Sequence, residues 1–120
     1  MSAQERAEQQ RLQALAALRA RSEATECQGT DGRITGDRAE VVVAIRGCRD
    51  YFIADGPNGQ YLLEWYGGHS PSRGDIIIGP INSYGFKDVC YPGKGTGRVW
   101  VDDYLLSKSR AQEKYLEKCQ

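Results

Sequence analysis

Short apolar runs separated by glycine-rich turns recur through the middle of this chain, and their spacing constrains the fold more than any other feature. The runs are rich in β-branched and aromatic residues, and they follow one another at intervals of about ten residues, the pattern of a small barrel or sandwich. They are residues 40–46, 51–54, 60–66, 76–78, 87–91 and 98–101. This pattern predicts five to six short strands.

The length of the chain, 120 residues, suits one hydrophobic core. We therefore predict a mainly β (α+β) fold: a small, five- to six-stranded, partly open barrel of the oligonucleotide-binding (OB) or SH3-like type, with an N-terminal and a C-terminal helix. The predicted parts are residues 1–38, an N-terminal helix and glycine-rich linker; 39–106, the β-barrel domain; and 107–120, a C-terminal helix packed on or beside the barrel.

The clearest local signal is a hairpin around residues 55–59 (DGPNG). Proline fixes φ and glycine permits positive φ, so this segment can reverse the chain between the runs at 51–54 and 60–66. Alternation in the second run is ambiguous, because Tyr61, Leu63 and Trp65 compete with the intervening residues for the core side.

The N-terminal segment is predicted to form a helix over about residues 3–23. Ser2 and Glu5 have the spacing of a capping box. The helix has a narrow apolar stripe that includes Leu12, Leu15 and Leu18. Two interpretations remain open: the stripe packs on this protein's own barrel or is partly frayed, or it pairs with a second copy as a short coiled coil to form a homodimer. Residues 27–38 are predicted to be a loop with at most one short strand, at Ile34.

The C-terminal segment changes period after Val101. Ser107 is a suitable helix N-cap, and Ala111, Tyr115 and Cys119 would share one face of the helix that follows. We expect Asp102 and Asp103 to lie at the start of this helix as capping residues.

The four cysteines, Cys27, Cys48, Cys90 and Cys119, lie too far apart for a CxxC pair, which argues against a zinc ribbon. Three pairings are open, and we favour reduced thiols because small oxidised domains usually contain more cysteine. Residues 1–21 lack the pattern of a secretory signal. We expect the cytoplasm, with the periplasm or secretion as the alternative if a signal was removed.

Composition argues against two classes of partner. The longest apolar stretch is about five residues, far short of a membrane span, so no membrane partner is expected. Lysine and arginine total 16 and aspartate and glutamate also total 16. Residues 39–106 hold six basic and eight acidic side chains, which leaves a formal charge of −2. A nucleic-acid-binding domain usually has a basic excess.

No catalytic motif is apparent. The single histidine, His69, lies in a Gly/Ser/Pro turn, where it is expected to be solvated. Residues 73–75 (RGD) match the tripeptide that integrins read, but Gly74 and Asp75 are more simply explained as a turn into the strand at 76–78. Residues 93–97 (GKGTG) are expected to form a hairpin loop instead of a phosphate cradle, since they join two strands. We predict no enzyme activity, no cofactor and no metal site.

The remaining signal is aromatic. Alternation in residues 98–102 (RVWVD) puts Val99 and Val101 on the core side and turns Trp100 outward beside Arg98. A helix that covered Trp100 would instead make it part of a second small core. The candidate binding residues are Trp100, Arg98, Tyr84, Phe86, Tyr91 and Lys87.

Three functional hypotheses follow. The first is a non-catalytic binding module that holds a protein or peptide partner on a barrel face. The second is a single-stranded nucleic-acid-binding OB-like domain, in which the aromatic residues stack on bases and the basic residues follow the backbone. The third is an enzyme whose site no motif announces.

Overall fold

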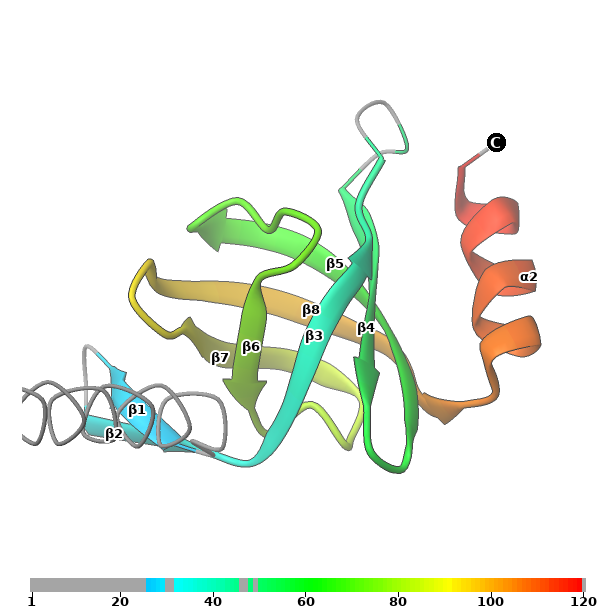
Figure 1. Cartoon of the computed structure of the whole chain (residues 1–120). Coiled ribbons are helices and arrows are strands. Elements are labelled where there is room, and N and C mark those ends of the chain that lie inside the picture. Colours follow the sequence, from blue (N-terminus) through cyan, green and yellow to red (C-terminus); the bar gives the residue numbers. More distant parts are fainter. Residues whose placement is uncertain (1–25, 30–31, 46–47, 49, 120) are drawn as a thin grey trace, which may run out of the picture.

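Six strands close into an antiparallel barrel in the computed structural model of the chain, and one helix packs on its outside (Figure 1). The structure describes residues 26–29, 32–45, 48 and 50–119. The barrel strands are β3 (Asp37–Val43), β4 (Tyr51–Gly56), β5 (Gly59–Gly68), β6 (Ile76–Gly79), β7 (Gly85–Tyr91) and β8 (Gly95–Leu106). The helix is α2 (Lys108–Lys118). The mainly β fold with a C-terminal helix is confirmed, whereas the predicted N-terminal helix lies outside the described residues.

The barrel is closed, which corrects the expectation of a partly open one. The strand order is β3-β4-β5-β8-β7-β6, and β3 pairs with β6 from Asp37 opposite Gly79 to Glu40 opposite Ile76. Closure removes the two unpaired strand edges that an open sheet would expose. The sequence pattern could not predict closure of the barrel, because closure depends on pairing between β3 and β6, which are far apart in the sequence.

The β4–β5 hairpin forms where the sequence predicted it. The strands pair without a break from Tyr51 opposite Glu64 to Gly56 opposite Gly59. Tyr61 and Leu63 face the barrel interior, whereas Leu62 packs beneath α2. Alternation was ambiguous in this strand because both of its faces are buried.

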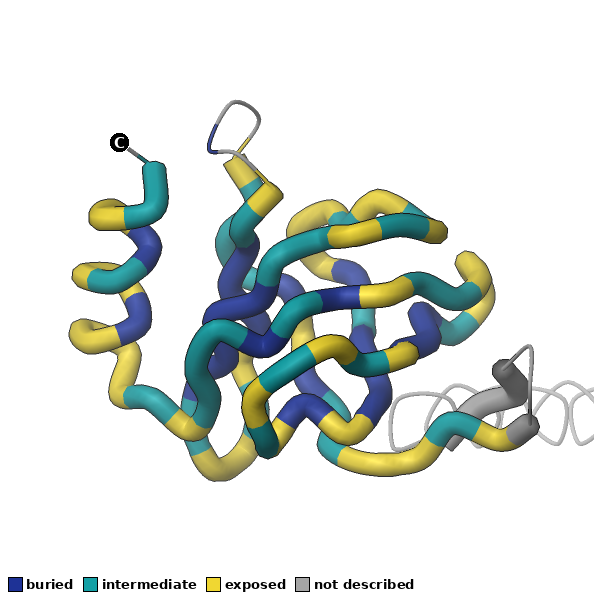
Figure 2. Tube along the Cα trace, turned by 180° about the vertical axis from the view of Figure 1, so that it is seen from behind, coloured by how far each residue is buried: buried dark blue, intermediate teal, exposed yellow. Residues whose placement is uncertain are grey.

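The barrel interior is the main core, and its buried stretches lie around the centre of the barrel (Figure 2). Strands β3, β4, β5, β7 and β8 each contribute alternate residues to it, as the pleat requires, and β6 contributes Ile77. Its fully buried members are Ala39, Val41, Phe52, Ala54, Tyr61, Leu63, Ile77, Ile81, Val89, Tyr91, Val99 and Val101.

Two short strands, β1 (Glu26–Gly29) and β2 (Gly32–Thr35), pair as an antiparallel hairpin where at most one strand was predicted. The hairpin lies against β6 and β7. Its sequence is rich in glycine and polar residues and lacks apolar alternation, so the strand signal was weak.

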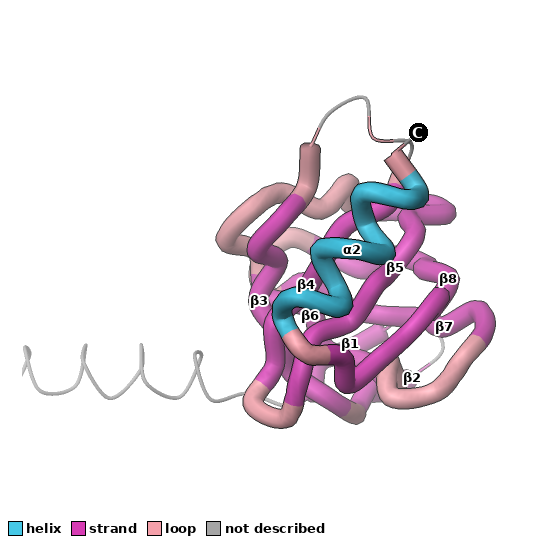
Figure 3. Tube along the Cα trace, turned by 90° about the vertical axis from the view of Figure 1, so that its right-hand side faces the viewer, coloured by secondary structure: helices cyan, strands magenta, loops and turns pink. Residues whose placement is uncertain are grey.

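Helix α2 covers the outer surface of β4 and β5 (Figure 3). The Ser107 hydroxyl caps it by accepting a hydrogen bond from the Arg110 N–H, 3.2 Å away. Ala111 and Tyr115 pack on Ile53 and Leu62, as the predicted helix face requires. Burying a large side chain such as Tyr115 contributes about 2 kcal/mol of stability.

Strand β8 runs to Leu106, further than predicted, so Asp102 and Asp103 do not cap the helix. Instead, Asp103 accepts a hydrogen bond from Lys114 at 2.5 Å, and Asp102 lies 3.7 Å from the Lys118 ammonium group. These pairs tie the exposed side of α2 to β8. No helix among the described residues is long and apolar enough to cross a membrane.

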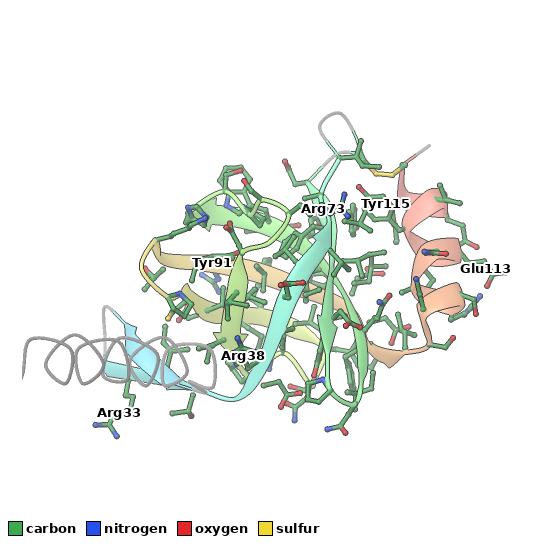
Figure 4. All side chains as sticks on the ribbon, viewed as in Figure 1. Arg33, Arg38, Arg73, Tyr91, Glu113 and Tyr115 are labelled. Carbon is green, nitrogen blue, oxygen red and sulfur yellow. A yellow bond between two sulfur atoms is a disulfide. The ribbon has the colours of Figure 1, made fainter. Side chains whose placement is uncertain are left out.

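The expectation of reduced thiols is wrong. Cys48, which lies between β3 and β4 in the sequence, forms a disulfide with Cys119 at the end of α2, and their Cα atoms are 4.5 Å apart (Figure 4). Cys90 is also disulfide-bonded. Sequence spacing could not identify these bonds, because Cys48 and Cys119 are 71 positions apart and only the fold brings them together.

Candidate functional site

A row of four outward-facing side chains crosses the barrel from β4 to β7. The register places Tyr51 opposite Glu64, Glu64 opposite Trp100, and Trp100 opposite Phe86. Directly opposed residues lie on the same face of a sheet. With the neighbouring Tyr66 and Arg98, this row forms the surface that we call the aromatic face: Tyr51, Glu64, Tyr66, Phe86, Arg98 and Trp100.

Phe86 is the centre of the aromatic face. Its ring lies 4.8 Å from the ring of Tyr66 and 4.8 Å from that of Trp100, both in edge-to-face geometry. The Arg98 guanidinium lies over the same ring, 4.8 Å from its centroid. Edge-to-face pairs and cation–π contacts are favourable. Yet Phe86 is 45% exposed and Tyr66 53%, so the cluster is organised while its surface stays open to a partner.

A second aromatic pair extends this surface toward α2. Tyr84 and Tyr104 are in edge-to-face contact at 4.9 Å. The Tyr84 hydroxyl donates a hydrogen bond to Asp103 at 3.3 Å, and the negative charge of Asp103 raises the pKa of Tyr84. Tyr84 is 62% exposed. The structure thus gathers Trp100, Arg98, Phe86 and Tyr84 on one side of the barrel.

Glu64 is the acidic residue of the aromatic face. Hydrogen bonding to its carboxylate raises the pKa of Tyr66. Burial raises the pKa of Tyr51 to about 12, and the charge of Glu64 adds to that increase. The ion pairs between described residues do not include Glu64. Within the described part of the chain, its carboxylate therefore lies beside aromatic side chains and forms no ion pair.

Trp100 faces outward, as alternation in β8 predicted, and α2 does not convert it into a core residue. Val99 and Val101 on either side of it are fully buried. The helix packs on β4 and β5, and Trp100 belongs to neither buried cluster. It is half-buried by its neighbours on the aromatic face.

Replacing Trp100 by alanine is expected to lower the free energy of unfolding by only about 1 kcal/mol, since the edge contact with Phe86 and part of the ring burial are lost. A core tryptophan would cost about 3–5 kcal/mol. A urea titration of the variant measures the difference. A loss in the core range would mean that Trp100 is a packing residue and would remove it from the candidate site.

Two of the predicted site residues, Tyr91 and Lys87, lie on the inward side of β7. Tyr91 is 1% exposed and lies in the barrel interior (Figure 4), so it cannot contact a partner on the outer surface. Lys87 is opposite Val99 in the register, on the face opposite to Phe86. Both residues are two positions from the buried Val89, so strand alternation alone assigns them to the inward face.

His69 is not simply solvated. Its Nε2 lies 2.8 Å from Oδ2 of Asp75, and its ring contacts Tyr91 at 4.8 Å. Asp75, whose side chain is only 1% exposed, also accepts hydrogen bonds from the Ser72 N–H at 2.9 Å and from the Lys94 ammonium group. We call His69, Asp75 and Lys94 the barrel-end cluster.

The barrel-end cluster fixes the β5–β6 connection across one end of the barrel. The Val41 N–H donates to the Asp75 carbonyl oxygen at 2.8 Å, and the Gly74 N–H donates to the Val41 carbonyl oxygen at 2.8 Å. Gly68, with φ at +79°, brings the chain so close to Thr96 that a Cβ would lie 2.3 Å from the Thr96 carbonyl oxygen. Asp75 is the last residue of the RGD tripeptide. Because its side chain is buried, we interpret the tripeptide as a turn into β6.

The chemistry of the barrel-end cluster is that of a structural anchor. Burial alone would raise the pKa of Asp75, but hydrogen bonds from Lys94, His69 and the Ser72 N–H outweigh this effect and lower it. A catalytic triad would also need a nucleophile on the histidine. In the described part of the chain no serine, threonine or cysteine side chain hydrogen-bonds to His69. No group of three or more metal-ligating side chains forms among these residues either.

Sequence reasoning missed Glu64, Tyr66 and Tyr51 as members of the aromatic face. The signal that could have found them is the β4–β5 register, since the turn at 55–59 fixes which residues of the two strands are opposite each other. Comparison with known proteins adds no assignment: no protein-family model, curated protein or solved structure matches this chain.

Proposed function

We propose that this chain is a non-catalytic binding module that holds a protein or peptide partner on its aromatic face. The observation that carries the proposal is the exposed cluster centred on Phe86, in which three aromatic rings and one guanidinium pack together and no described helix or strand covers them. Protein interfaces are enriched in aromatic residues and arginine, which supply most of the binding energy at a few positions.

The charge of the aromatic face favours a protein over single-stranded nucleic acid. Rings and arginine would suit stacked bases, but a phosphate backbone also needs a track of basic side chains. Glu64 lies inside the row of rings, and Asp88 is the cross-strand neighbour of Arg98. These carboxylates would repel phosphates beside the only strongly exposed cation of the face.

The disulfides support a second part of the proposal, that the chain works in an oxidising compartment such as the periplasm or the extracellular space. Disulfides persist there and are rare in the cytosol, where thiols are kept reduced. The bond between Cys48 and Cys119 holds α2 on the barrel, where the helix packs on β4 and β5. This evidence favours the alternative location over the cytoplasm.

Peptides selected from a displayed random library on the immobilised protein test the binding face. Phe86→Ala is expected to weaken their affinity at least about tenfold, equivalent to about 1.4 kcal/mol, because Phe86 is the ring that its neighbours pack around. Isothermal titration calorimetry measures the change.

Leu116→Ala is the matched control, since Leu116 is an apolar residue 63% exposed on α2, away from the face. Equal affinity of the selected peptides for the wild type and Phe86→Ala would contradict the proposal. Tight binding of an oligothymidylate that Phe86→Ala abolishes would support the nucleic-acid alternative.

A further inference from the structure

The aromatic face places a carboxylate among aromatic rings, and this combination favours a cationic ligand. Glu64 is directly opposite Tyr51 on one side and Trp100 on the other, and Tyr66 follows two positions later in the same strand. Aromatic faces attract cations through the ring quadrupole, and a nearby carboxylate adds charge attraction. A lysine or arginine side chain combines an apolar stem for the rings with a charged end for the carboxylate.

The charges around Glu64 also favour a cationic ligand. Asp50 adds a second carboxylate near Tyr66, since its charge contributes to the raised pKa of that hydroxyl. The Trp65 N–H donates to the Asp50 carbonyl oxygen at 2.8 Å, which places Asp50 beside β5. In the described part of the chain, Asp50 and Glu64 take part in no ion pair. Among the described residues, this end of the face therefore carries two carboxylates that are not paired with a cation.

Two cations of the chain contact rings of the aromatic face, and neither of them pairs with Glu64. Arg98 lies over Phe86 at the other end of the face. The Lys118 ammonium group lies 5.5 Å from the centroid of the Tyr51 ring, but it is also 3.7 Å from Asp102, which offsets its charge. Neither cation pairs with Glu64.

We propose that Glu64, with Tyr66 and Trp100, forms a subsite for a lysine or arginine side chain of the protein partner. This inference rests on the proposed function and deepens it, because it states the chemistry of the partner. It commits to a basic side chain on a polypeptide; a small alkylammonium compound such as choline is an alternative that the test distinguishes.

The test follows the two tryptophan indole N–H signals of the ¹⁵N-labelled full chain by NMR. The probes are acetyl-Gly-Gly-Lys-Gly-Gly-amide, the same peptide with glutamine in place of lysine, and choline, all at one ionic strength. The Trp100 signal is expected to shift and saturate with the lysine peptide. The Trp65 signal is an internal control, because Trp65 packs against the barrel core.

Glu64→Gln is expected to weaken the response of Trp100 to the lysine peptide about two- to fivefold, because it removes an exposed charge pair while the cation–π contact remains. Glu113→Gln is the matched control, since it removes the same charge from a side chain on α2 that points away from the barrel (Figure 4). An equal response to the glutamine peptide, or an unchanged response in Glu64→Gln, would overturn the inference. Tighter saturation by choline would also overturn it.

Failure of this inference is distinguishable from failure of the proposed function. If Phe86→Ala abolishes binding of the library-selected peptides while Glu64→Gln leaves both assays unchanged, the binding face is retained and the cation subsite is wrong. If Phe86→Ala has no effect on the selected peptides, the binding face itself is wrong.

Discussion

Asp75→Asn is expected to lower the free energy of unfolding by about 3 kcal/mol, because a buried carboxylate with several donors is replaced by a group that is itself a donor. Asp75 accepts from His69, Lys94 and the Ser72 N–H, and its side chain is 1% exposed. The amide oxygen of asparagine can accept some of these hydrogen bonds. Its NH₂ group would face the remaining donors and cannot accept from them.

The control for Asp75→Asn is Asp88→Asn, because Asp88 is exposed on the outer surface of β7. It is expected to change stability by no more than about 0.5 kcal/mol. Chemical denaturation at neutral pH measures both variants. Similar losses in the two would contradict the barrel-end cluster as an anchor of the β5–β6 connection.

The barrel-end cluster also predicts how the loss of stability in Asp75→Asn depends on pH. The pKa of Asp75 is lowered in the folded chain, so its contribution is fully present above the unfolded-state pKa of about 3.9 and is lost as pH falls through the lower folded value. The difference in stability between the wild type and Asp75→Asn should therefore be constant near neutral pH and shrink below about pH 4.

Removing the Cys48–Cys119 disulfide with serine at both positions is expected to cost about 2–4 kcal/mol. The bond closes a loop with a sequence separation of 71, for which the chain-entropy argument gives about 4 kcal/mol. A helix of 11 residues is marginal by itself, so α2 should exchange its amide hydrogens faster once it is untied.

The double serine variant is a cleaner test than adding a reductant, since a reductant would also break the disulfide of Cys90. Urea titration gives the loss of stability, and hydrogen exchange gives the protection of α2. A loss below about 1 kcal/mol with unchanged protection would mean that the contacts of Ala111 and Tyr115 with Ile53 and Leu62 hold the helix without the bond.

Local patterns in the sequence predicted the elements that depend on neighbouring residues. The turn at 55–59 predicted the β4–β5 hairpin, and Val99 and Val101 predicted the outward Trp100. In the same way, Ser107 predicted where α2 begins. Each depends on turn chemistry, pleat period or capping, which act over a few residues.

Features that depend on distant residues were not predictable in this way. Barrel closure requires β3 to meet β6, and the disulfide requires Cys48 to meet Cys119. The pairing of His69 with Asp75 depends on a loop that lies across the barrel end, where no period applies. Tyr91 is a different case, because it was predicted to be a binding residue and lies in the barrel interior. Alternation from the buried Val89 indicates an inward side chain, but the prediction gave more weight to the aromatic ring than to its position in the strand.

A chemical-shift map of the ¹⁵N-labelled chain with a library-selected peptide tests the central claim most directly. The aromatic face as the binding surface predicts that the largest shifts fall on the outward residues of β5, β7 and β8, with Glu64, Tyr66, Phe86 and Trp100 among them, and that they disappear in Phe86→Ala. Shifts concentrated instead at the barrel-end cluster of His69, Asp75 and Lys94 would contradict it, because they would place the partner at a structural anchor away from the exposed rings.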